Sequence, residues 1–115
     1  MSWSNPIFII SGAAGASFLL GYIFTKIWPP KEINDFYGYR TKRSKRSKEA
    51  WDFAQEYSTR MMLYITLLNL ALGISGLFIQ VEETLSFIIS MGFMTMTVIW
   101  LFWKTESQLK EQFGE

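Results

Sequence analysis

The sequence contains neither cysteine nor histidine. Disulfides, thiol nucleophiles and imidazole bases are therefore excluded, and the usual protein ligands of zinc and haem are missing. The carboxylates that are present have ordinary explanations as helix caps or surface charges, and no nucleophile lies beside a base. We therefore expect no catalytic residue, no metal site and no cofactor, and a protein that is not an enzyme.

Charge is also missing from three long stretches, although half of the 115 residues are hydrophobic and 17% are aromatic. Each uncharged stretch has about 20 residues, enough for a helix that crosses roughly 30 Å of hydrocarbon. We predict an all-α membrane protein with a single domain, residues 1–115. Its transmembrane helices are expected at about Pro6–Trp28, Met61–Val81 and Thr84–Trp103.

The first uncharged stretch has a second interpretation, as a secretory signal. Such a signal has a basic start before its apolar region. Here the first residues are uncharged, and the nearest basic residues, Lys26 and Lys31, follow the apolar stretch. We therefore favour a membrane span over a cleaved signal.

Basic residues gather in one segment of the chain. Nine of the eleven Lys and Arg residues lie within residues 26–60, whereas the connection Gln80–Thr84 carries two glutamates and no cation. Positive loops remain on the cytoplasmic side of a membrane. We therefore expect a cytoplasmic motif loop, residues 29–60, and a cytoplasmic tail, residues 104–115, with the N-terminus outside.

The first two predicted spans contain features typical of helix packing in membranes. Ala13, Ser17 and Gly21 are four residues apart, and small residues at this spacing let another helix approach closely. The approaching helix belongs either to the same chain or to a second copy in a homo-oligomer. In the second span, we expect Asn69 to act as a polar clamp that hydrogen-bonds a neighbouring helix.

A short amphipathic helix is predicted before the second span. Ser47 is a suitable N-cap residue, and apolar residues recur at helical spacing from Ala50 to Met61. We expect this helix to lie at the cytoplasmic interface and to bend into the second span.

The stretch Tyr37–Thr41, Tyr-Gly-Tyr-Arg-Thr, holds the most specific polar chemistry. Gly38 indicates a turn with positive φ that aims both tyrosine rings at one surface, and Asn34 could brace this turn through backbone amides. Arg40 has a planar guanidinium group whose paired N–H donors suit a phosphate or a carboxylate. The stretch is either an interfacial belt that only orients the protein or its working site.

Six cations and no acid occur between Arg40 and Lys48. Each cation near an anionic leaflet contributes on the order of 1 kcal/mol, so this run should bind anionic lipid headgroups of the bilayer. No nucleic-acid partner is expected, because the run lies between membrane segments and lacks a folded element that could recognise a nucleic acid. Trp51 is either an interfacial anchor or a ring packed on the turn between Tyr37 and Tyr39.

The motif resembles the signature of the SdpI family of small bacterial membrane proteins. The matching positions are Ile33, Asn34, Tyr37, Gly38, Tyr39, Arg40, Thr41, Ser44, Ser47, Trp51 and Ala54. In that family one transmembrane helix precedes the motif and two follow it, so the resemblance covers roughly residues 1–105. This chain departs from the family pattern at Lys42, where proline is frequent, and at Gln55, where asparagine is usual.

The resemblance implies a function. The family's namesake is an immunity protein that protects a bacterium from its own membrane-active peptide toxin, and it is linked to holding a repressor at the membrane. We therefore expect a multi-pass protein of the bacterial plasma membrane that gives toxin resistance, binds a partner such as a repressor at the cytoplasmic face, or does both. The candidate contact residues are Asn34, Tyr37, Gly38, Tyr39, Arg40, Thr41, Ser44, Ser47, Trp51 and Gln55.

Two other functions remain as alternatives. One is a lipid-handling protein or membrane enzyme, in which Arg40 grips a lipid phosphate. The other is a small transporter subunit, which would need to form oligomers because three helices cannot enclose a pore alone.

Overall fold

The computed structural model describes residues 4–114. These residues form a π-helical turn, η1 (Ile7–Ser11), and the helices α1 (Gly12–Ile27), α2 (Lys48–Ser75) and α3 (Glu83–Phe113). No strand occurs in this part of the chain, so the predicted all-α fold is confirmed. Residues 1–3 and 115, which the predicted domain includes, lie outside the described residues.

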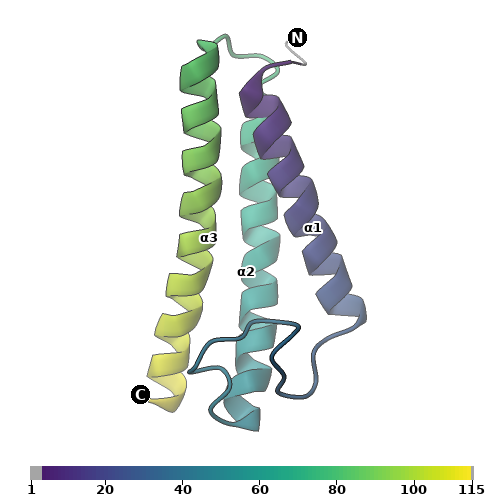
Figure 1. Ribbon diagram of the computed structural model, residues 1–115, viewed down its shortest axis with the longest axis vertical. Helices are drawn as coiled ribbons and strands as arrows, with labels where there is room; N and C mark the ends of the chain where they lie inside the picture. The colour runs from purple at the N-terminus through teal and green to yellow at the C-terminus, as the bar shows by residue number, and fades with distance from the viewer. Residues whose placement is uncertain (1–3, 115) are drawn as a thin grey trace.

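The helices lie side by side along the 49 Å length of the molecule, and α2 packs on both α1 and α3 (Figure 1). η1 contacts α2 and α3, so the bundle is closed at the end that carries the α2–α3 connection. Toward the other end α1 and α3 diverge, and the segment between α1 and α2 crosses this end of the bundle (Figure 1).

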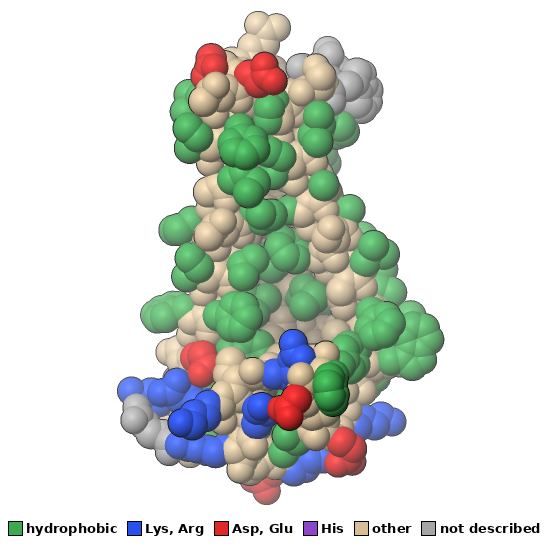
Figure 2. Space-filling model, in the orientation of Figure 1, with side chains coloured by type: hydrophobic (Ala, Val, Ile, Leu, Met, Phe, Trp, Pro, Cys, Tyr) green, Lys and Arg blue, Asp and Glu red, His purple; other side chains and the backbone are tan. Residues whose placement is uncertain are grey.

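Two segments, Ile7–Ile27 and Glu83–Phe113, are long and apolar enough to cross a membrane. Both direct large apolar side chains outward: Leu20 is 68% exposed and Ile99 is 56% exposed. Apolar side chains cover the middle of the molecule, whereas charged side chains gather at its ends (Figure 2). An exposed apolar band of this kind is suited to hydrocarbon and not to water.

α2 differs in two ways from the helices that the sequence predicts. The expected amphipathic helix and the second span form one uninterrupted helix, so only residues 29–47 of the predicted motif loop are non-helical. The helix also ends at Ser75, whereas the predicted span continues to Val81. Where it ends, Gly76 lies close against η1: a Cβ atom on Gly76 would lie 2.7 Å from Ile7 Cγ2.

The small residues of α1 bring it close to α2. A Cβ atom on Gly73 would lie 2.9 Å from the backbone nitrogen of Gly12, and one on Gly15 would lie 2.6 Å from Leu70 Cδ2. Close approach through small residues therefore occurs within one chain. Ala13 and Ser17 are exposed, and the homo-oligomer predicted from them stays a prediction.

Asn69 joins α2 to α3 in the middle of the bundle. Its side chain is fully buried, and its Nδ2 donates to Thr97 Oγ1 at 3.1 Å and to the Ile65 carbonyl at 2.8 Å. These two bonds satisfy the amide nitrogen and lower the cost of placing it in hydrocarbon, while the buried Oδ1 has no hydrogen-bond partner among the described residues.

α3 continues beyond its uncharged part to Phe113, so most of the predicted tail, residues 104–115, is helical. Leu101, Thr105 and Leu109 are four residues apart and buried, so one face of the tail packs inward. This packing places Glu106, which follows Thr105, beside the segment between α1 and α2.

Candidate functional site

Residues 29–47, here called the cap loop, lie across the end of the bundle at which α1 and α3 diverge (Figure 1). The cap loop contains most of the residues that the sequence indicates as a site. Three sets of hydrogen bonds attach it to α1, α2 and α3.

The turn at Tyr37–Gly38–Tyr39 begins with Asn34. The Asn34 Oδ1 accepts hydrogen bonds from the backbone amides of Phe36 at 2.9 Å and Tyr37 at 2.7 Å. This is the bracing expected of an asparagine before a turn. The Tyr37 hydroxyl then donates to the carbonyl of Trp28 at the end of α1. The first tyrosine of the motif therefore attaches the cap loop to α1.

Gly38 is required for two physical reasons. Its φ is +99°, which lies in the left-handed region that side chains rarely allow. A Cβ atom there would also lie 2.6 Å from Gln55 Oε1 and 2.7 Å from Pro30 Cγ. Gly38 thus lets the loop backbone lie directly against α2 and against the proline link, Pro29–Pro30, which follows α1.

Gln55 attaches the cap loop to α2. Its Oε1 accepts from the Tyr39 amide and its Nε2 donates to the Tyr39 carbonyl, both at 2.7 Å. The side-chain amide therefore satisfies both backbone groups of one buried residue. An asparagine at this position is one methylene shorter and would lie farther from the loop backbone.

Trp51 is fully buried beneath the cap loop, and its Nε1 donates to the Pro30 carbonyl at 2.7 Å. The interfacial-anchor interpretation of Trp51 is therefore wrong, because the ring has no exposed surface. Its hydrogen-bond partner is the proline link that leaves α1, rather than the tyrosine turn.

Glu106 attaches the cap loop to α3. Its Oε2 accepts from the hydroxyls of Tyr39 and Thr41, both at 2.7 Å, and its Oε1 lies 3.1 Å from an Arg43 guanidinium nitrogen. Burial raises the pKa of the Tyr39 hydroxyl above its usual value, and the Glu106 carboxylate raises it further. Tyr39 therefore remains a protonated donor across the physiological range.

Sequence reasoning does not find Glu106. It lies in the predicted tail, more than sixty residues from its partners in the cap loop. The available signal is the buried repeat of Leu101, Thr105 and Leu109, which places Glu106 at the edge of an inward face.

The serine and threonine residues of the motif shape the backbone. The Thr41 amide donates to Ser44 Oγ at 2.8 Å, and the Ser44 amide donates to Thr41 Oγ1 at 3.2 Å. Ser47 is the N-cap of α2 and accepts from the Ala50 amide at 3.0 Å. These side chains close a turn and start a helix, as hydroxyl residues at such positions commonly do.

Arg40 lies on the exposed surface of the cap loop. Its guanidinium donates to the Asp35 carbonyl at 2.6 Å, while the Asp35 carboxylate pairs with Lys45 at 2.6 Å. The hydrogen bond and the charge of Lys45 hold the pKa of Asp35 below its usual value. Arg40 thus braces the loop from outside and leaves the rest of its guanidinium accessible.

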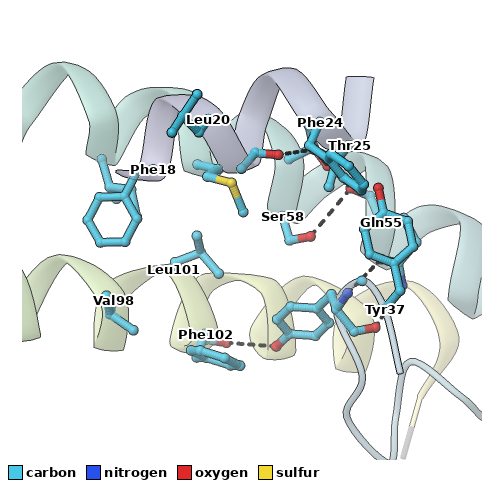
Figure 3. A pocket seen from close by; sticks show the side chains of 16 residues that line it. Phe18, Leu20, Phe24, Thr25, Tyr37, Gln55, Ser58, Val98, Leu101 and Phe102 are labelled. Atoms are coloured by element: carbon cyan, nitrogen blue, oxygen red, sulfur yellow. Dashed lines mark hydrogen bonds between the residues drawn. The ribbon is translucent and has the colours of Figure 1, made fainter. Parts of the chain in front are cut away.

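A cavity of about 540 Å³ lies directly beneath the cap loop (Figure 3). Phe18 of α1 and Val98 of α3 lie at one end, and Tyr37 and Gln55 lie at the other end, next to the loop (Figure 3). The cap loop therefore has charges on its outer side and an apolar chamber on its inner side.

The comparisons with known proteins agree with this geometry. The SdpI/YfhL protein family matches residues 31–103, which run from the cap loop through most of α3. This chain belongs to the SdpI/YfhL family. The cap loop, α2 and the uncharged part of α3 are thus the family's shared unit, and the family resemblance inferred from the motif is confirmed.

One curated relative is the "Uncharacterized protein YfhL" of Bacillus subtilis strain 168. It is 38% identical over 68 residues, which are 56% of this chain and 62% of the relative. The match therefore spans less than two thirds of the relative's length. No solved structure matches the chain.

Contacts with three helices explain why the motif of this SdpI/YfhL-family chain is long and mixed in residue type. Tyr37 contacts the end of α1, Gly38 and the Tyr39 backbone contact α2, and the Tyr39 hydroxyl contacts α3. The order tyrosine, glycine, tyrosine is therefore set by three different helices.

Proposed function

We propose that this SdpI/YfhL-family membrane protein crosses the bilayer three times. α1 and α3 have the length and apolarity of spans, and α2 packs against both of them. The part of α2 from Met61 to Ser75 carries no charge, so it can share their depth in the hydrocarbon. Its most polar residue, Asn69, bonds α3, which lowers the cost of that position.

We further propose that the cap loop and the C-terminal tail face the cytoplasm. The cations lie at the cap-loop end, while Glu82 and Glu83 lie at the opposite end (Figures 1 and 2). Loops rich in Lys and Arg stay on the inner side of bacterial membranes. This orientation places the N-terminus outside.

The function that these features support best is resistance to a membrane-active peptide toxin. The observation that carries this proposal is the assembly of the family's signature residues into a cap attached to all three helices. The polar atoms of this cap bond one another, an arrangement that suits a rigid support better than a reactive centre. The toxin would meet the bundle in the membrane or at its outer face, and the cap would keep the helices in register.

A second role, binding of a cytoplasmic partner, is favoured by the outer surface of the cap loop. Lys42 and Arg46 are exposed there, and the Arg46 guanidinium donates to the Gly114 carbonyl at 3.1 Å. Such cations suit an acidic protein surface or anionic headgroups. A repressor held at the membrane would be a partner of this kind.

The test of the proposal is survival under the toxin. The full chain is expressed in a sensitive bacterial strain, and surviving colonies are counted against an empty-vector strain after exposure to the secreted peptide toxin of an SdpI system. We expect the chain to raise survival. Equal survival of the two strains would contradict toxin resistance.

A variant of the cap connects this resistance to the site. Tyr39→Phe removes only the hydroxyl that bonds Glu106, and Tyr64→Phe removes the hydroxyl of a tyrosine that is 51% exposed. We expect Tyr39→Phe to reduce survival at equal membrane content, whereas Tyr64→Phe should protect like the native chain. Full protection by Tyr39→Phe would exclude this bond from the mechanism.

A further inference from the structure

The cavity beneath the cap loop is bounded on three sides and closed at one end. α2 forms its floor through Met62 and Ile65, α1 and α3 form facing walls, and the turn at Tyr37–Tyr39 closes one end (Figure 3). No helix of residues 4–114 covers the side opposite α2 (Figure 1). The cavity therefore opens sideways, between two helices that are both suited to hydrocarbon.

The lining changes along the length of the cavity. Far from the cap loop the walls are Phe18, Val98 and Leu101, which offer no hydrogen bond. At the cap-loop end, Thr25, Gln55 and the Tyr37 hydroxyl bring polar atoms to the wall (Figure 3). Such a gradient fits a molecule with an apolar tail and a polar head.

A smaller pocket, of about 300 Å³, continues this polar end. It shares Thr25, Gln55 and Thr59 with the cavity, and the Thr59 and Thr25 hydroxyls lie 3.5 Å apart between the two spaces. Lys26 and Lys31 line this pocket, as do Asp52 and Glu56, and the Asp52 carboxylate pairs with Lys48. Lys26 and Lys31 therefore lie where the cavity becomes polar, together with the carboxylates of Asp52 and Glu56.

We infer that the cavity holds one acyl chain of a phospholipid from the cytoplasmic leaflet, with the phosphate directed toward Lys26 and Lys31. The inference rests on the proposed position in the membrane, because lipid chains then border the open side of the cavity. An acyl chain that enters gains contact with walls that would otherwise face an empty space. The cavity volume lies within the range of roughly 300–1,000 Å³ that is usual for small-molecule sites.

The decisive variant fills the cavity from α3. Val98→Trp places a large ring at the apolar end, whereas Ile99→Trp, the matched control, adds the same ring one residue further along, where the native side chain is 56% exposed. The purified full chain is incubated in detergent with palmitoyl-oleoyl phosphatidylglycerol, and retained lipid is counted by native mass spectrometry. We expect one retained lipid for the native chain and for Ile99→Trp, and a loss of roughly tenfold in affinity for Val98→Trp.

A second measurement needs no variant. The native chain is incubated with dihexanoyl phosphatidylglycerol, which has the same headgroup on short chains. We expect it to be retained much more weakly than the long-chain lipid, because the cavity binds the chain. Equal retention of both lipids, no retained lipid on the native chain, or full retention by folded Val98→Trp would overturn the inference.

These outcomes are independent of toxin resistance. A native chain that protects cells but retains no lipid would refute the acyl-chain site and leave the proposed function intact. A chain that retains lipid but does not protect cells would do the reverse.

Discussion

At the η1 end of the bundle, backbones lie directly against one another, whereas at the cap-loop end polar side chains join segments of the chain across wider gaps. Gly73 meets the backbone of Gly12 at the first end, and Gly76 meets Ile7. At the second end Gln55 and Glu106 reach the cap loop through hydrogen bonds of 2.7 Å. The η1 end thus depends on close approach of the backbones, whereas the cap-loop end, apart from Gly38, depends on polar side chains.

The difference follows from the surroundings of each end. Within hydrocarbon, apolar contact with lipid competes with apolar contact between helices, so close approach of small residues supplies the packing. At a membrane surface the chain leaves the helix, and its backbone groups need other partners. The cap loop obtains these partners from Asn34, Ser44, Trp51 and Gln55. It also crosses the end of the bundle at which α1 and α3 diverge.

Trp51→Ala should break the cap-loop end with the largest effect. It removes a fully buried ring and the hydrogen bond to Pro30, and we expect a loss of about 3–5 kcal/mol in stability. Thermal unfolding in detergent, followed by circular dichroism, measures the change. Trp103→Ala, which removes a ring that is 63% exposed, is the control and should change stability little. Similar losses in both variants would show that the ring under the cap loop has no special role.

Glu106→Ala should have the next largest effect. It leaves the Tyr39 and Thr41 hydroxyls without their shared acceptor, and we expect a loss of roughly 1.5–3 kcal/mol, the contribution of hydrogen bonds to a charged group. Proteolysis within residues 29–47 should also become faster, because the cap loop loses its attachment to α3. Glu111→Ala, at an exposed position of the same helix, is the control. A cap loop that is equally protected in both variants would contradict this attachment.

Gly73→Ala tests the opposite end, where the expected effect is smaller. The added methyl group meets the Gly12 backbone at 2.9 Å, so the helices must separate, at a cost of roughly 1–3 kcal/mol. Gly92→Ala adds the same methyl group where nothing lies within 4 Å and should be neutral or slightly stabilising. The comparison between the ends also predicts that Gly73→Ala leaves proteolysis of the cap loop unchanged. Faster cleavage there would show that the two ends are coupled.

The amino-acid sequence by itself determined the helices, their approximate positions and the family. Long runs without charge, a helical repeat before Met61 and the motif from Ile33 to Ala54 are all local patterns, and local patterns can be read along the chain. Asn34, Gly38 and Ser47 act on backbone within a few residues, so the roles expected of them match the contacts that they make.

Only the tertiary structure decided which residues meet across the bundle. Glu106 is an ordinary surface acid in the sequence, and Trp51 is equally compatible with an exposed or a buried ring. The contacts of both residues depend on how far α3 is shifted along α2 and on the path of the cap loop between the helices. No short stretch of sequence encodes either of these. The cavity has the same origin, because it is the space left where α1 and α3 diverge beneath the loop.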